Sequence, residues 1–226
     1  WAACDLDGSA NGFDPAQAGA FVARAAGDPC DPNPCMDPPA AACDAETGER
    51  ITYPAMGECA NADGVPECTY APQRAACPDG EICAEGACVP EGLRAPAEGE
   101  VIFSEVLYDP HGDVLAEGSA EWFELHNLTD EPLGLDGCQA VNGNNSAALD
   151  GVVLLPGAFA VFTQGGADVN GGIEPDGAFD FSLGNGGATL LLTCAAGDVD
   201  TLAYDDGAPF PRDARRHSIS LDPQGY

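Results

Sequence analysis

Two carboxylates and an imidazole lie close together in the stretch EWFELHN, residues 121–127. Glu121 and Glu124 could supply an acid and a base, as in glycosidases, and His126 is one of only 3 histidines in the chain. A β-strand with one polar face is the competing interpretation. The element that carries these residues decides between an active site and a structural strand.

A β-strand over 121–127 places alternate side chains on opposite faces. Phe123 and Leu125 then share the core face, whereas Glu124 and His126 share a solvated outer face with Trp122. A catalytic carboxylate pair needs a cleft that raises the pKa of one member, and an exposed strand face does not provide one. The chain also lacks the H-E-x-x-H, G-x-S-x-G and P-loop motifs. We therefore expect no enzymatic activity.

The region 100–226 is predicted to be all-β, because short apolar runs alternate with Gly, Asp, Asn and Pro. The candidate strands are 101–108, 121–127, 137–141, 147–155, 158–163, 188–194, 198–204 and 217–221. Their spacing is typical of an antiparallel sandwich. Cys138 and Cys194 each fall in a candidate strand, and we expect them to form a disulfide with each other.

Several segments of about 100–222 resemble, in order, the lamin-tail domain in its bacterial extracellular branch. These segments are VIFSEVLYDP, GSAEWFELHN, LGLDGCQ, LLPGAFAVF, LGNGGATLLL, GDVDTLAYDDG and RHSISLDP. The resemblance implies an immunoglobulin-like β-sandwich. It also implies a mostly non-enzymatic role in surface, structural or secreted hydrolytic proteins, with no catalytic residues to transfer.

The segment 30–90 is predicted to be a disulfide-stapled, loop-rich module, followed by a linker at 91–99. Its few large apolar side chains cannot form a sufficient core without cross-links. The cysteine spacing lacks C-x2-C knuckles and the segment has no His, so disulfides are favoured over zinc. The Cys, Pro and Gly spacing resembles EGF-like modules of secreted bacterial surface proteins. The sequence leaves the pairing open among Cys30, Cys35, Cys43, Cys59, Cys68, Cys77, Cys83 and Cys88.

Residues 1–29 are predicted to form an N-terminal arm with a short helix that begins near Asp14. Four oxygen-bearing residues before this helix alternate like the first ligands of a calcium loop: Asp5, Asp7, Ser9 and Asn11. Ala10 stands where that loop needs a glycine, so an acidic turn is the competing interpretation. No cofactor is required, and Ca²⁺ is the one ion that this pattern suggests.

The remaining cysteine, Cys4, either pairs with another chain, stays free or displaces one bridge of the module. The chain holds 11 cysteines, a density that indicates an oxidising, extracellular environment. We therefore expect a secreted protein at the cell surface.

The net charge of −31 comes from 38 acidic residues against 7 arginines. Such a chain repels nucleic acids and anionic membranes, and no apolar run is long enough for membrane insertion. The arginines of the C-terminal region are concentrated in one place: Arg212, Arg215 and Arg216. This basic segment is a candidate contact for an acidic surface of another copy; neutralisation of nearby aspartates is the alternative.

The leading hypothesis is a bacterial cell-surface structural protein that assembles with copies of itself into a homo-oligomer, polymer or filament. A calcium-dependent adhesion, carbohydrate-binding or protein-binding module is the second, with Trp122 and Tyr108 as candidates for stacking on a sugar. The third is an accessory domain of a secreted hydrolase.

Overall fold

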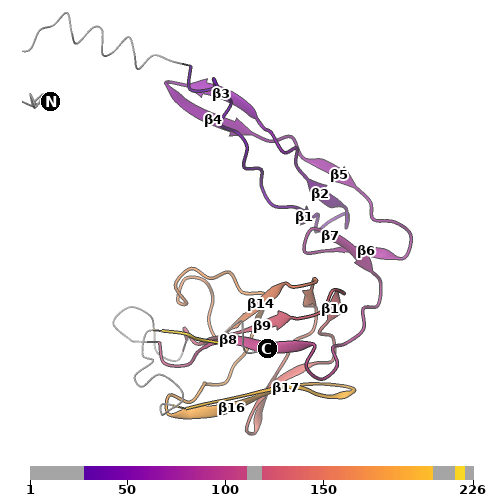
Figure 1. Cartoon of the computed structure of the whole chain (residues 1–226), viewed down its shortest axis with the longest axis vertical. Helices are drawn as coiled ribbons and strands as arrows, with labels where there is room; N and C mark the ends of the chain where they lie inside the picture. Colours follow the sequence, from indigo (N-terminus) through magenta and orange to yellow (C-terminus); the bar gives the residue numbers. More distant parts are fainter. Residues whose placement is uncertain (1–27, 111–118, 206–216, 222–226) are drawn as a thin grey trace, which may run out of the picture. The chain divides into compact units, whose positions relative to one another are not determined.

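The computed structural model describes residues 28–110, 119–205 and 217–221 (Figure 1). The chain divides into two compact units, Trp1–Cys77 and Pro78–Tyr226, and the boundary lies inside the segment 30–90. All regular elements of the described residues are β-strands, so the all-β prediction is confirmed. None of the described residues forms a helix long and apolar enough to cross a membrane.

Several predicted features lie outside the described residues. These are the helix of the N-terminal arm, the calcium-loop residues Asp5, Asp7, Ser9 and Asn11, the odd cysteine Cys4, and the arginines Arg212, Arg215 and Arg216. The predictions that concern them remain predictions.

The first unit contains two small sheets that do not share a large core. Its strands are β1 (Ala42–Cys43), β2 (Arg50–Thr52), β3 (Glu58–Ala62), β4 (Val65–Thr69) and β5 (Gln73–Ala75). Strands β1, β2 and β5 form one sheet, and β3 pairs with β4 in a hairpin. Asp63 and Gly64 connect the hairpin with positive φ angles of 53° and 86°, the conformation that favours Asp-Gly in a two-residue turn.

Disulfides hold the first unit together where apolar burial is scarce. Cys35 is the only buried apolar residue that this unit shows among the described residues. Cys30 bonds to Cys59 and Cys35 bonds to Cys68, while Cys59 and Cys68 face each other across the β3–β4 hairpin. Two adjacent positions of the hairpin are thus tied to the segment that precedes it. The cysteines Cys43, Cys77, Cys83 and Cys88 are also disulfide-bonded.

The second unit begins with a short hairpin and continues as two larger sheets. Its first strands are β6 (Glu81–Ala84), β7 (Ala87–Pro90), β8 (Val101–Leu107), β9 (Trp122–Asn127), β10 (Leu133–Gly134), β11 (Gln139–Asn142) and β12 (Asn145–Ala148). The later strands are β13 (Val153–Leu154), β14 (Phe159–Thr163), β15 (Gly177–Ala178), β16 (Gly187–Cys194), β17 (Gly197–Asp205) and β18 (Ile219–Ser220).

The two larger sheets pack face to face as a sandwich (Figure 1). One has 5 strands in the order β15-β14-β9-β8-β18, and the other has 4 in the order β12-β11-β16-β17. Phe123 is fully buried at the centre of the core, where it stacks on Phe162 and Phe179 with ring centroids 5.2 Å apart in each pair. Leu190 and Leu192 of β16 are equally buried from the opposite sheet.

Cys138 and Cys194 form a disulfide, as the sequence predicts. Their neighbours Gln139 and Thr193 are paired between β11 and β16, so the disulfide joins adjacent strands of the 4-stranded sheet. It therefore differs from the disulfide of antibody domains, which links the two sheets of the sandwich.

The predicted strand 147–155 is wrong as a single element, because a turn at Asp150 and Gly151 divides it into β12 and β13. Gly151 has a φ of 83°, which a glycine adopts without strain. Its amide donates to Asp136 Oδ1 at 2.7 Å, and the Gly137 amide donates to Asp150 Oδ1 at 2.7 Å. This reciprocal pair of bonds fixes the turn.

Candidate functional site

Two residues of strand β9 that were candidates for catalysis, Glu124 and His126, make structural contacts instead. Phe123 and Leu125 are fully buried, and Glu124 and His126 are half-buried on the other face. The Ser104 hydroxyl donates to Glu124 Oε1 at 2.6 Å, and His126 stacks on Phe159 with ring centroids 4.0 Å apart. Glu124 and His126 therefore each contact a different neighbouring strand.

Asn127, the last residue of β9, is a buried hydrogen-bonding centre. Its amide nitrogen donates to the carbonyls of Glu131, Leu154 and Leu155 at 2.9–3.1 Å. Its amide oxygen accepts from the backbone N–H and the hydroxyl of Thr129 at 2.9 and 2.8 Å. The side chain thus joins the end of β9 to the turn that follows and to the end of β13.

Glu121, directly before β9, is only 4% exposed. Its Oε2 accepts the backbone N–H of Leu183 at 2.6 Å, which ties the start of β9 to the segment before β16. Burial is the main cause that raises the pKa of this carboxyl, and the nearby Asp109 carboxyl raises it further. The hydrogen bond from Leu183 opposes both effects.

Glu121 belongs to a buried polar cluster with Asp109, Tyr108 and Tyr204. The two tyrosine rings stack with centroids 4.5 Å apart, and the Asn185 side chain donates to Asp109 Oδ1 at 3.2 Å. Burial raises the pKa of the Tyr204 hydroxyl, and Glu121 adds to that shift. This cluster fastens the ends of β8, β9 and β17 to one another.

The hypothesis that Trp122 and Tyr108 stack on a sugar is wrong, because both side chains are buried. Tyr108 is 2% exposed and Trp122 is 9% exposed. Trp122 pairs across the outer face of the sheet with Leu107 and Thr163, which are also buried. The face that contains Glu124 is therefore solvated only in part.

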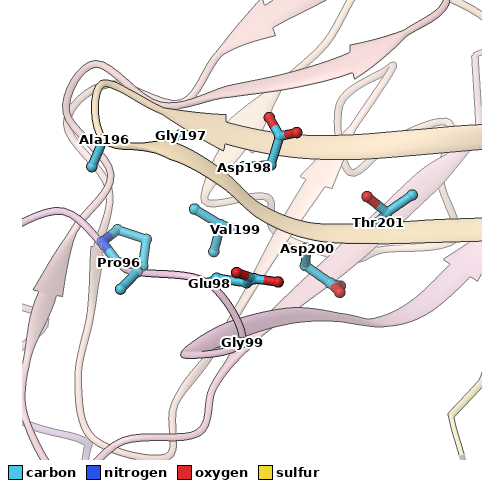
Figure 2. Close-up of a pocket in the computed structure, with 10 residues that line it drawn as sticks. Pro96, Glu98, Gly99, Ala196, Gly197, Asp198, Val199, Asp200 and Thr201 are labelled. Carbon is cyan, nitrogen blue, oxygen red and sulfur yellow. The ribbon is translucent and has the colours of Figure 1, made fainter.

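An open groove lies along the first residues of β17 (Figure 2). Its volume is about 740 Å³, and its walls are the segments 96–99 and 196–201. The residues that line the groove include the buried Val199 and three acidic residues, Glu98, Asp198 and Asp200. Among the strands of the described residues, β17 is the last of its sheet, and one of its edges pairs with none of them.

Hydrogen bonds hold both walls of the groove in place. The Gly99 amide donates to the Val199 carbonyl at 2.9 Å and joins the two walls. The Phe103 amide donates to Asp200 Oδ2 at 2.8 Å, which fixes that carboxylate against β8. Such a groove has little conformational freedom to lose when it binds a partner.

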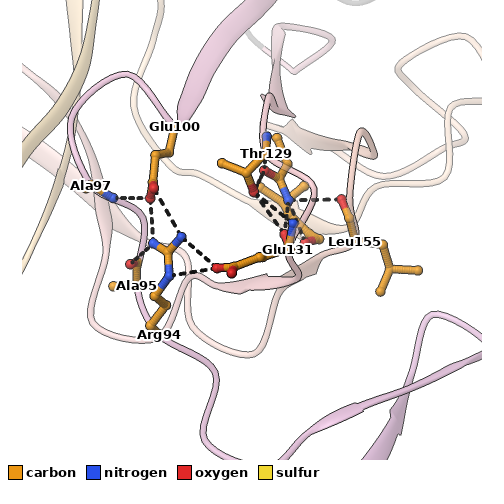
Figure 3. A network of polar contacts seen from close by, with 9 residues as sticks. Arg94, Ala95, Ala97, Glu100, Thr129, Glu131 and Leu155 are labelled. Atoms are coloured by element: carbon orange, nitrogen blue, oxygen red, sulfur yellow. Dashed lines mark hydrogen bonds and ion pairs between the residues drawn. The ribbon is translucent and has the colours of Figure 1, made fainter.

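Arg94 secures the segment that leads to the groove (Figure 3). Its guanidinium contacts Glu100 at 2.5 Å and Glu131 at 3.1 Å, and Glu100 also accepts the Ala97 amide at 2.8 Å. The Arg94 carbonyl accepts the Gly134 amide at 3.0 Å. The predicted linker 91–99 is therefore bonded to the sandwich at its C-terminal end.

The groove carboxylates have no cationic neighbour in the part of the chain that the structure describes. Arg74 pairs with Asp44, and Arg94 pairs with Glu100 and Glu131. No described arginine or histidine lies within ion-pair distance of Glu98, Asp198 or Asp200. The described residues of the groove therefore carry negative charge that no described cation neutralises.

Sequence reasoning missed the roles of Asn127 and Arg94 and the groove, and it did not predict that Glu121 is buried. Among the described residues, no three His, Cys, Asp or Glu side chains are grouped so that they could hold a metal ion. The calcium prediction concerns residues outside this part of the chain.

Comparison with known proteins gives no match to a family model, to a curated protein or to a solved structure.

Proposed function

We propose that this chain is a secreted, non-catalytic structural protein that associates with copies of itself at a cell surface. The observation that carries the proposal is the acidic groove beside the edge of β17 that pairs with no other strand of the described residues. A fixed, open groove next to a strand edge suits binding of an extended segment, and its carboxylates, which form no ion pair among the described residues, select a cationic one.

The disulfide content supports the extracellular part of this proposal. The described residues of the first unit bury little apolar surface and are cross-linked by bonds such as Cys30–Cys59 and Cys35–Cys68. Disulfides of this density persist in oxidising compartments and are rare in the cytosol.

The two-sheet sandwich supports assignment to a lamin-tail-like, immunoglobulin-like fold. The segments that carry the resemblance correspond to long strands: VIFSEVL is β8, WFELHN is β9 and GATLLLTC is β16. The structural use of Glu121, Glu124 and Asn127 supports a role without catalysis.

Sedimentation velocity of the oxidised chain, measured from low to high salt and with reducing agent, tests self-association. Because of their large net charge, copies of the chain repel one another at low salt. Near 0.15 M salt the Debye length is about 8 Å, so salt weakens this long-range repulsion more than it weakens ion pairs at short range. We expect concentration-dependent association at about 0.15–0.5 M salt, where long-range repulsion is screened. A monomer at every salt concentration contradicts the proposal.

A further inference from the structure

We propose that the groove between residues 96–99 and 196–201 binds the basic segment 212–217 of a second copy of the chain. This inference rests on the proposed self-association and names the surfaces that would form the contact. The residues that line the groove all belong to the described part of the chain.

The edge of β17 provides the backbone side of the contact. Val199 is joined to Gly99 at the start of the groove. Thr201 and Ala203 follow as exposed residues of a strand that pairs with no other strand of the described residues on that side. An extended segment can lie along such an edge and form main-chain hydrogen bonds to it. The groove therefore suits an extended peptide better than a compact small molecule.

The carboxylates determine the chemistry of the occupant. Glu98 and Asp198 are exposed, and neither makes an ion pair or a hydrogen bond with another described side chain. Asp200 lies on the same strand and is held in place by the Phe103 amide. Cationic side chains on an extended segment complement this arrangement, and arginine is the only basic residue besides histidine that the chain contains.

Charge complementarity selects the basic segment 212–217, with the sequence RDARRH, as the occupant. It holds three of the 7 arginines of the chain, and two of them, Arg212 and Arg216, fall on one side of an extended segment. Arg74 and Arg94, by contrast, already pair with carboxylates of their own units. Two copies that each carry a charge of −31 can approach closely only where their few cations meet acids.

The contact is heterologous, because the groove and the basic segment are different surfaces of the same chain. Each copy then binds one neighbour through its groove and another through its basic segment. Such contacts build a ring or an open filament rather than a closed dimer.

Charge reversal on each surface tests the contact. The groove variant carries Glu98→Arg and Asp198→Arg, and it leaves Asp200 intact because that carboxylate binds the Phe103 amide. The segment variant carries Arg212→Glu, Arg215→Glu and Arg216→Glu. The matched control carries Glu174→Arg and Asp180→Arg, two exposed carboxylates outside the groove. Far-ultraviolet circular dichroism and Trp122 fluorescence check that each variant folds.

Each charge-reversed variant alone is expected to associate at least about tenfold more weakly than wild type at 0.15 M salt. A mixture of the two variants is expected to associate like wild type, because the reversed groove then faces the reversed segment. The groove variant lowers the net charge from −31 to −27, so general repulsion predicts stronger association for it, as it does for the control.

The outcomes separate the contact from self-association in general. If wild type associates and both variants alone associate equally well, copies meet through another surface and this inference fails while the proposed function stands. If the variants weaken association but their mixture does not restore it, the segment occupies the groove of its own chain or acts elsewhere, and the inference fails. If wild type stays monomeric, both fail together.

Discussion

Removal of the Cys138–Cys194 disulfide tests how the sandwich is stabilised. The bond closes a loop with a sequence separation of 56 residues. Chain-entropy reasoning assigns roughly 4 kcal/mol to a cross-link that closes a loop of this length, because it removes conformations from the unfolded state. The replacement Cys138→Ala with Cys194→Ala should therefore lower the free energy of unfolding by about 4 kcal/mol.

Urea unfolding followed by the fluorescence of Trp122 measures this change. Trp122 is buried on β9 and reports on the sandwich, and a Trp1→Phe background removes the only other tryptophan. With a urea dependence of roughly 1–3 kcal/mol/M, the midpoint should fall by roughly 1–4 M. The variant keeps β11 and β16 paired, because both strands are held by a backbone ladder and by the core.

A second disulfide provides the matched control. Cys30→Ala with Cys59→Ala removes a bond of the first unit and should leave the Trp122 transition unchanged. A loss below about 1 kcal/mol for the sandwich variant, with native circular dichroism, would refute the loop-closure reasoning.

Three further changes give separate tests. Asn127→Ala removes the amide that satisfies buried carbonyls, and urea unfolding should show a loss of about 3 kcal/mol, whereas a change near zero would mean that water replaces these bonds. Burial raises the pKa of Glu121, so the folded state favours the protonated carboxyl. The contribution of this carboxyl to the free energy of unfolding is therefore complete below the ordinary carboxyl pKa and is lost as pH rises through the higher folded-state pKa. Glu121→Gln should make the melting temperature less sensitive to pH between about 4 and 7, and an unchanged profile would contradict this assignment. Arg94→Ala frees Glu100, so amide hydrogen exchange at Ala97 should become faster; an unchanged rate would show that the ion pairs do not hold the wall of the groove.

The strand pattern of the sandwich was predictable where the signal is local. Alternation of apolar and polar side chains placed Phe123 and Leu125 on the core face of β9, and both are fully buried. Cys138 and Cys194 could be paired because they are the only two cysteines of their region. The turn at Asp150 and Gly151 carries an Asp-Gly signal that was available but was outweighed by the apolar residues on either side.

The site residues were less predictable because their partners are distant in the sequence. The acceptors of Asn127 include Leu154 and Leu155, 27 and 28 residues away. Glu121 is buried against Leu183, 62 residues later, and nothing in the local sequence separates it from the more exposed Glu124. The groove likewise forms only when segment 96–99 meets the start of β17.

Electron microscopy of the oxidised full chain at 0.15–0.5 M salt tests the central claim most directly. Self-association through two different surfaces predicts filaments or rings in which every copy has the same two neighbours. Only isolated particles or closed two-fold dimers, at concentrations up to the solubility limit, would contradict the account.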